Sequence, residues 1–192
     1  MFRRMTRERF LSDAEFEAFM AAVRGRRHKH QPRDHALFAL LGNTGIRPSE
    51  ALGLTSNEVH VYARPSWIRV VRMKKRKTAR EFDDIELPAA LASILRRHIE
   101  HNTINCGQRL FTMTRRQARR LFHYYAQLAG ITRKTNLYIL RHTAATRIYR
   151  ATRDIKVVQA LLGHEKPDTS SIYAHIPRAM LSELADSFPA VV

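Results

Sequence analysis

The chain has 192 residues, of which 44% are apolar, and its 34 Lys and Arg against 17 Asp and Glu give a net charge of +17. This apolar content excludes an intrinsically disordered protein, and the longest apolar runs are too short to span a bilayer. The single cysteine, Cys106, excludes a disulfide framework and a thiolate metal site. We therefore predict a cytoplasmic globular protein with no membrane partner, folded as one domain or as a tight pair of lobes.

The positive charge is clustered, which predicts a polyanionic partner, and nucleic acid is the commonest one. Three stretches hold much of it: residues 24–33, 72–80 and 114–120. His28, His30 and His35, in and beside the first stretch, could suggest a metal site, but no carboxylate or cysteine pattern accompanies them. We expect instead a basic loop that faces DNA, and no metal.

The first helix is predicted to begin after Ser12. Ser12 and Glu15 have the spacing of a capping box, and Leu11 and Phe16 have the spacing of a hydrophobic staple. The apolar face that this helix turns inward is expected to comprise Phe16, Phe19, Met20 and Val23.

A second helix is predicted from about residue 34 to residue 43, because apolar residues crowd this segment and Gly45 breaks it. The segment "RPSEALGL" then predicts a short third helix, since Pro48 is suited to a first helical turn. The residues of the second helix expected in the core are Leu37, Phe38, Leu40 and Leu41.

Between residues 59 and 87 the pattern changes to the alternation of β-strands. The segments "VHVY", "WIRVV" and "DIEL" predict a small antiparallel sheet of about three strands. Lysine-rich "KKRKTAR" (residues 74–80) separates the second of these segments from the third, so we expect it to form the tip of a hairpin.

Helices return after the sheet, first over residues 89–101 and then in a helix that Thr114 and Gln117 cap and Gly130 ends. Further helices are predicted at residues 137–150, 154–162 and 177–187. The capped helix is expected to bury Ala118, Leu121, Phe122, Tyr125 and Leu128, and to expose the DNA-binding residues Arg115, Arg116, Arg119 and Arg120. The predicted fold class is therefore α+β, mainly helical with a small antiparallel sheet.

The segment "LLGHEKPDTSSIYAHI" (residues 161–176) places Tyr173 near the end of the chain. A phenol with a pKa of about 10 attacks slowly unless its target is strongly electrophilic. A phosphodiester repels nucleophiles through its negative charge, so an enzyme without a metal must neutralise the transition state with fixed cations. Arginine suits this task because it is always charged and binds phosphate oxygens in pairs, and a lysine or histidine can protonate the leaving alkoxide.

The sequence offers such residues in three places. Arg47 follows a glycine turn at a helix start, with Glu50 one turn later, although a structural salt bridge would by itself explain that pair. Arg141 stands in the apolar segment "LYILRHTAA", where an unpaired arginine would be costly. Several lysines crowd the hairpin tip, and His164 precedes Tyr173 by nine residues.

These segments resemble the boxes of the tyrosine recombinase (phage integrase) family. The resemblance is carried by "TGIRPSEALGL", "LRHTAATRI", "LLGHEKPDTSSIYAH" and a lysine-bearing hairpin, and it covers the chain from about residue 10 to its end. Each box alone is modest, but the ordered set at family-like spacing is highly specific. The resemblance implies the mainly helical catalytic domain of the family, which recombines DNA through a 3′-phosphotyrosyl intermediate without metal, ATP or any other cofactor.

The resemblance also assigns roles to the matching residues. Arg47 and Arg141 would clamp the phosphate, with Glu50 and His142 as supporting residues. Tyr173 would be the nucleophile that bonds to the 3′ phosphate of DNA and releases a 5′-hydroxyl.

His164 would take the place of the second histidine of the family, and a lysine of the hairpin would protonate the leaving oxygen. Lys77 is the first choice, because "KTAREFDDIELP" resembles the family's Lys-Thr followed by the last strand of the sheet. Lys75 is the alternative, since the hairpin varies in length. The hairpin residues expected to contact DNA are Lys74, Lys75 and Arg76.

The chain departs from the family pattern in two respects. The second arginine box of the family usually reads His-x-x-Arg-His, and here its first position is Tyr138, which we count among the catalytic residues as a neutral hydrogen-bond donor. The alternative is that Tyr138 only packs. The N-terminal helical domain that most members use to clasp DNA is expected to be absent, so that residues 1–192 form a single catalytic domain. Either the chain was cut from a longer one, or it is a domain-only member like the fimbrial-switch invertases.

The leading prediction is a site-specific recombinase that acts on double-stranded DNA and assembles on it as dimers and then tetramers. An apolar face on the helix predicted at residues 177–187 favours this assembly. A type IB topoisomerase-like activity is one alternative. A catalytically weak or inactive DNA-binding protein on the same fold is another, and Tyr138 is the residue that favours it. A nucleoid-associated protein of prokaryotic, viral or mobile-element origin is implied.

Overall fold

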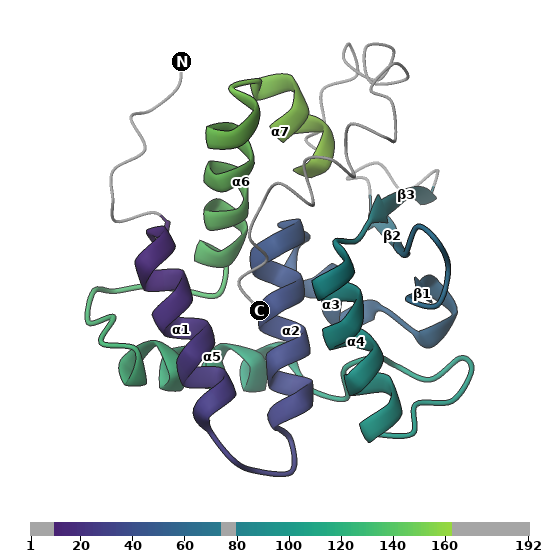
Figure 1. The fold of residues 1–192 in the computed structure, drawn as a ribbon, viewed down its shortest axis with the longest axis horizontal. Coiled ribbons are helices and arrows are strands. Elements are labelled where there is room, and N and C mark those ends of the chain that lie inside the picture. The colour runs from purple at the N-terminus through teal and green to yellow at the C-terminus, as the bar shows by residue number, and fades with distance from the viewer. Residues whose placement is uncertain (1–9, 74–79, 163–192) are drawn as a thin grey trace.

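The computed structural model of the protein describes residues 10–73 and 80–162. Helices dominate it, and the strands form one antiparallel sheet at their side, which is the predicted α+β fold (Figure 1). Among the described residues, no helix has the length and apolar character needed to cross a membrane. In chain order the elements are α1 (Asp13–Gly25), α2 (Gln31–Thr44), α3 (Pro48–Gly53), the 3₁₀-helix η2 (Ser56–Glu58), β1 (Val59–His60), β2 (Trp67–Met73), β3 (Arg80–Glu86), α4 (Ala89–His101), α5 (Arg115–Leu128), α6 (Ile139–Thr152) and α7 (Ile155–Leu162).

Helix α2 lies at the centre of the molecule and packs against α1, α3, α4 and α6 (Figure 1). Phe38 of α2 is fully buried, and its ring centroid lies 5.2 Å from that of Phe19 and 5.8 Å from that of Tyr125, both edge to face. Such pairs contribute roughly 0.5–1.5 kcal/mol each beyond the area that they bury. The helix begins at Gln31, three residues earlier than predicted, because Pro32 is suited to a first turn, where its missing N–H costs nothing.

The predicted capping boxes are present at α1 and α5. Glu15 donates its backbone N–H to Ser12 Oγ at 3.2 Å, and Ser12 donates its own N–H to Glu15 Oε2 at 2.7 Å. Thr114 and Gln117 make the same reciprocal bonds at the start of α5. The expectation that Leu128 points inward is wrong, because Leu128 is the last residue of α5 and its side chain is 57% exposed beyond the packed face.

The sheet has the strand order β1-β2-β3, and both pairings are antiparallel. Ile68 of β2 lies between Val59 of β1 and Ile85 of β3, and all three are buried on the face that meets the helices. Phe82 of β3 is 56% exposed. Strand β1 has two residues and is shorter than predicted, because the chain turns directly towards β2. The hairpin tip, residues 74–79, and the helix predicted at residues 177–187 lie outside the described residues.

Helix α6 is buried on most of its circumference, which explains how polar side chains of this helix reach the interior. Of residues 139–148, His142 alone is exposed. Thr143 Oγ1 accepts the backbone N–H of Leu11 at 2.9 Å and so joins the start of the described chain to α6. Helix α6 begins at Ile139, two positions after the predicted start. Helix α7 packs an apolar face against α6, in a cluster formed by Ala145, Ile148, Val157, Val158 and Leu162.

Candidate active site

The turn between α2 and α3 requires a glycine. Gly45 ends α2 with a φ of +66°, and its N–H donates to the carbonyl oxygen of Leu41 at 3.1 Å. A Cβ atom at this position would lie 2.7 Å from Leu162 Cδ2 and 3.1 Å from Ala144 Cβ. Gly45 therefore combines the left-handed backbone conformation with close contact to α6 and α7. The turn places Arg47 directly before the first residue of α3.

Arg47 is held by Glu50, as the sequence predicts. Glu50 Oε1 accepts Arg47 Nη1 at 2.7 Å, and Glu50 Oε2 accepts the backbone N–H of Arg47, also at 2.7 Å. The Glu50 side chain is 7% exposed, whereas that of Arg47 is 35% exposed. The buried carboxylate of Glu50 thus holds the Arg47 guanidinium in place, while part of the Arg47 side chain remains accessible to an anion.

Arg141 is buried in α6, with 8% of its surface exposed. Its Nη1 donates to the carbonyl oxygen of Gly45 at 2.6 Å, and its Nη2 donates to the carbonyl oxygen of Leu162 at 2.6 Å. These short charge-assisted bonds offset part of the cost of removing the cation from water. The sequence analysis missed both partners, because a main-chain carbonyl leaves no signal in residue type.

Three segments that are distant in sequence therefore meet at one guanidinium. Gly45 belongs to the turn that carries Arg47, Arg141 belongs to α6, and Leu162 is the last described residue, two positions before His164. Six of the predicted site residues lie outside the described residues, and they are Lys74, Lys75, Arg76, Lys77, His164 and Tyr173.

Tyr138 directly precedes α6 and is partly buried. Its backbone N–H donates to Asn136 Oδ1 at 2.9 Å, and Arg115 Cζ lies 5.5 Å from the centre of its ring. The contact joins Tyr138 to the first residue of α5, the helix that carries the predicted DNA-binding arginines. His142, one turn after Tyr138, is exposed.

The arginines on the outer side of α5 are positioned as the amphipathic pattern predicts. The opposite side of the helix packs Phe122 and Tyr125 into the core. Four guanidinium groups are therefore turned to solvent on two successive turns, where they can meet a phosphate backbone. The exposed residues are Arg115, Arg116, Arg119 and Arg120.

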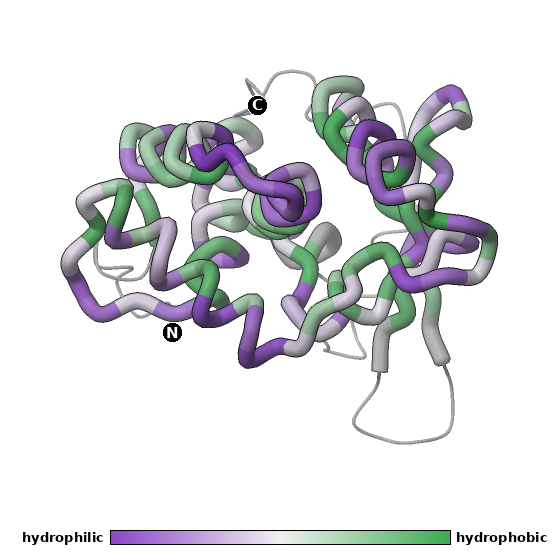
Figure 2. Tube along the Cα trace, turned by 90° about the horizontal axis from the view of Figure 1, so that it is seen from below, coloured by the Kyte–Doolittle hydropathy of each residue, from purple (hydrophilic) through white to green (hydrophobic). Residues whose placement is uncertain are grey.

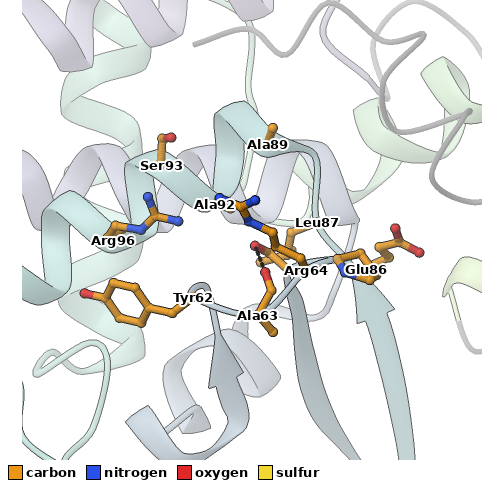
Figure 3. Close-up of a pocket in the computed structure, with 11 residues that line it drawn as sticks. Tyr62, Ala63, Arg64, Glu86, Leu87, Ala89, Ala92, Ser93 and Arg96 are labelled. Carbon is orange, nitrogen blue, oxygen red and sulfur yellow. Dashed lines mark hydrogen bonds between the residues drawn. The ribbon is translucent and has the colours of Figure 1, made fainter.

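A cavity of about 590 Å³ opens between the β1–β2 connection and α4. Figure 3 shows the side chains of Arg64 and Arg96 at this cavity, with Tyr62 at one end. Arg96 Nη2 donates to the carbonyl oxygen of Val61 at 2.8 Å, and its guanidinium lies over the ring of Tyr62. Among the described residues, the predicted catalytic ones, Arg47, Tyr138 and Arg141, do not line the cavity.

A second arginine of α6, which the sequence analysis did not single out, is also buried. Arg147 is 8% exposed, its Nη1 donates to Asn43 Oδ1 at 3.3 Å, and its Nε lies 3.6 Å from Asp13 Oδ1. Burial lowers the pKa of Arg147, and the carboxylates of Asp13 and Glu17 oppose that shift. Its partners tie α6 to α1 and α2, so this cation belongs to the scaffold of the site.

Comparison with known sequences identifies the family of the chain. The sequence profile of the phage integrase family matches residues 9–179. The chain is 33% identical over 158 residues to tyrosine recombinase XerD of Shewanella oneidensis, an alignment that covers 79% of this chain and 52% of that protein. It is 31% identical over 161 residues to tyrosine recombinase XerC of Neisseria meningitidis serogroup B, with 80% of this chain and 51% of that protein covered. The chain thus spans about half the length of these relatives.

Solved structures share the fold. The XerA recombinase superposes with a TM-score of 0.70 at 24% identity, over 96% of this chain and 64% of its own. The XerH recombinase bound to its difH substrate before cleavage gives a TM-score of 0.68 at 24% identity, over 89% of this chain and 51% of its own. The lambda integrase catalytic core gives a TM-score of 0.60 at 16% identity, over 81% of this chain and 95% of its own. With a family profile that matches 9–179 and a fold shared with recombinases, the chain belongs to the phage integrase family.

Proposed function

We propose that the chain is the catalytic domain of a tyrosine-type site-specific DNA recombinase. The observation that carries the proposal is the meeting of Arg141 with the turn of Arg47, through the 2.6 Å bond to Gly45. Two arginines supplied by neighbouring elements are the kind of cationic clamp that phosphoryl transfer needs. Family membership supports the same reaction class.

In the proposed reaction, the Tyr173 phenolate oxygen bonds to the scissile phosphorus, and the bond from phosphorus to the 5′ oxygen breaks. Lys77, or Lys75 in its place, gives a proton to that 5′ oxygen. Arg47, Arg141 and His164 bind the non-bridging oxygens, whose charge grows in the transition state. A 5′-hydroxyl of a second strand then attacks the phosphorus, the bond from phosphorus to the Tyr173 oxygen breaks, and the lysine takes up the hydroxyl proton. The reaction conserves the phosphodiester energy and requires no ATP.

The proposed partner is double-stranded DNA, bound through the arginines of α5 and the hairpin lysines. Many phosphate contacts make affinity fall steeply with salt concentration. XerH was solved bound to difH, and lambda integrase was solved as a dimer on a core site. By analogy we propose that this chain acts as dimers on DNA and that two dimers form the tetramer that exchanges strands.

A trapping experiment tests the chemistry. The protein is incubated with a pool of nicked duplexes of randomised sequence, in which cleavage beside the nick releases a short strand and prevents rejoining. The proposal predicts a covalent protein–DNA adduct that survives denaturation, and Tyr173→Phe should bind DNA equally well without forming it. DNA binding without any adduct would favour the inactive DNA-binding alternative. If the protein forms adducts and also relaxes a supercoiled plasmid that lacks paired sites, the topoisomerase alternative would be favoured.

A further inference from the structure

The segment between α1 and α2, residues 26–30, lies far from the proposed active site; we call it the α1–α2 loop. It precedes the first residue of α2, whereas Arg47 follows the last, so a helix of 14 residues separates them. At a rise of 1.5 Å per residue this separation is about 20 Å. Figure 1 shows the loop at the lower end of α2, and Figure 2, seen from below, looks directly onto its hydrophilic residues.

The loop and its flanks carry an excess of positive charge. Residues 24–33 contain five Arg and Lys and no Asp or Glu. Arg24 pairs with Glu17 at 2.9 Å, and Arg33 pairs with Asp34 at 2.8 Å. Among residues 10–73 and 80–162, no carboxylate pairs with the remaining three cations, which are Arg26, Arg27 and Lys29.

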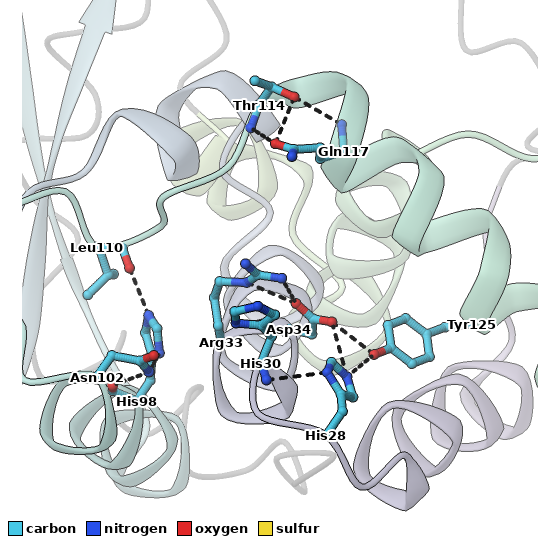
Figure 4. A network of polar contacts seen from close by, with 10 residues as sticks. All are labelled: His28, His30, Arg33, Asp34, His98, Asn102, Leu110, Thr114, Gln117 and Tyr125. Carbon is cyan, nitrogen blue, oxygen red and sulfur yellow. Dashed lines mark hydrogen bonds and ion pairs between the residues drawn. The ribbon is translucent and has the colours of Figure 1, made fainter.

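Although the loop is at the surface, buried groups hold its backbone in place. Asp34 is fully buried, and the hydroxyl of Tyr125 donates to its Oδ2 at 2.9 Å (Figure 4). His28 Nε2 lies 3.2 Å from that hydroxyl and 3.7 Å from the same carboxylate oxygen. The N–H of His30 donates to His28 Nδ1 at 3.3 Å, and the N–H of Gln31 donates to the His28 carbonyl at 2.9 Å.

These contacts also define the charge of His28. Because its Nδ1 accepts from His30, the ring proton of the neutral form lies on Nε2, which faces the Tyr125 oxygen. Burial lowers the pKa of His28, and Asp34 opposes the shift only in part. The ring therefore serves as a neutral anchor at neutral pH. Arg27 and Lys29, on either side of it, are exposed and project from a fixed backbone.

The loop contacts α5 near the end of that helix opposite to Arg115. Arg26 stacks on Tyr124 at 4.4 Å, near the end of α5, whereas Arg115 is the first residue of that helix. Helix α2 therefore separates the loop from Arg47 by about 20 Å, whereas Arg120 of α5 lies four positions before Tyr124. A preorganised cationic surface in this position loses little entropy when it binds a polyanion.

We propose that the α1–α2 loop is a second DNA-binding surface, which holds the phosphates of a DNA segment other than the one at Arg47 and Arg141. The inference rests on the proposed function, since a protein already bound to DNA meets further DNA at high local concentration. Exposed Arg27 and Lys29 contact the phosphates, and Arg26 reinforces them from its stack on Tyr124.

A bridging assay tests this surface. A short biotinylated duplex is immobilised and loaded with protein, and a dye-labelled duplex is then added and its retention measured. The loop variant is Arg27→Gln with Lys29→Gln. The matched control is Arg64→Gln with Lys156→Gln, which removes the same charge from exposed positions elsewhere. Binding of the first duplex is measured separately by fluorescence anisotropy.

The wild type and the control should retain the labelled duplex, and the loop variant should retain roughly ten-fold less, with first-duplex affinity changed by less than about three-fold. Equal retention by the loop variant and the wild type would overturn the proposal, because a bridge between two protomers would not need these charges. Equal losses of affinity and retention would also overturn it, by assigning the loop to the first duplex.

Polyglutamate provides a further comparison. If the wild type retains no labelled duplex but binds polyglutamate, and the loop variant does not bind it, the loop would be assigned to an acidic protein. A wild type that binds the first duplex but forms no covalent adduct would contradict the proposed function alone.

Discussion

The guanidinium of Arg141 donates to the main-chain carbonyl of Gly45 across 96 positions of sequence, at 2.6 Å. This bond fixes the spacing between the helix that carries one proposed phosphate ligand and the turn that carries the other, Arg47. The second bond of Arg141, to Leu162, attaches the end of α7 to the same point. The structure of the site can therefore be tested separately from its chemistry.

Arg141→Ala should lower both stability and cleavage, whereas Arg47→Ala should lower mainly cleavage. Removal of Arg141 leaves two buried carbonyls without a donor, a loss of roughly 1–3 kcal/mol, while Arg47 is 35% exposed. Each variant also loses a preorganised cation, so cleavage should fall on the order of 10²-fold or more. Urea unfolding and adduct formation measure the two effects. If DNA affinity falls as far as cleavage, the arginines are simple phosphate anchors.

Gly45→Ala should destabilise the protein by roughly 1–3 kcal/mol, because alanine strains a backbone φ of +66° and its Cβ would meet Leu162 Cδ2 at 2.7 Å. Gly53→Ala is the matched control, since a Cβ at Gly53 meets nothing within 4 Å. The control should be neutral or slightly stabilising. Thermal unfolding of the two variants provides the comparison, and equal midpoints would show that the turn tolerates a side chain.

Tyr138→Phe should reduce cleavage by about ten-fold and leave DNA binding unchanged, because it removes one hydrogen-bond donor worth about 1.4 kcal/mol. The variant keeps the ring that Arg115 contacts, so the loss reports on the hydroxyl alone. Tyr138→His should retain or raise activity and add a pH dependence near neutrality. Single-turnover cleavage across pH gives both results. A fully active Tyr138→Phe together with an inactive Tyr138→His would assign Tyr138 to packing.

The ion pair between Glu15 and Arg133 should stabilise the fold in a pH-dependent way. The side-chain hydrogen bond from Arg133 lowers the pKa of Glu15 from 4.5 to about 2. A depressed carboxylate pKa contributes stability that is complete above the unfolded value and is lost as the pH falls through the folded value. The stability difference between wild type and Glu15→Gln should thus shrink between pH 4.5 and pH 2. Denaturant titrations over this range measure it, and a difference that stays constant would exclude the ion pair as its source.

The local patterns of the sequence predicted the elements that hold Arg47 and the arginines of α5. A glycine two residues before Arg-Pro specifies a turn and a helix start, and the spacing of Thr114 and Gln117 specifies a cap. These signals are local, because each depends on the backbone of a few neighbouring residues. The family resemblance added the pairing of Arg47 with Arg141, which no local pattern contains.

Contacts between distant residues could not be predicted in this way. Asp34 marks only a helix start in the sequence, yet its carboxylate is buried and accepts the hydroxyl of Tyr125, 91 residues later. The hydrogen-bond partners of Arg141 could not be predicted for another reason, because every residue type offers the same main-chain carbonyl oxygen. Exposure of Leu128 was mispredicted because a periodic apolar pattern does not show where the neighbouring elements end.

Two long-range hydrogen bonds of α6 have a consequence for biosynthesis. Thr143 bonds to Leu11 across 132 positions, and Arg141 bonds to Gly45 across 96. A ribosome releases the chain from its N-terminus, so α1, α2 and the sheet emerge before either partner on α6 exists. Closing such long loops is a late and slow event in folding. A nascent chain therefore exposes the proposed DNA-binding loop before it can assemble the paired arginines of the proposed active site.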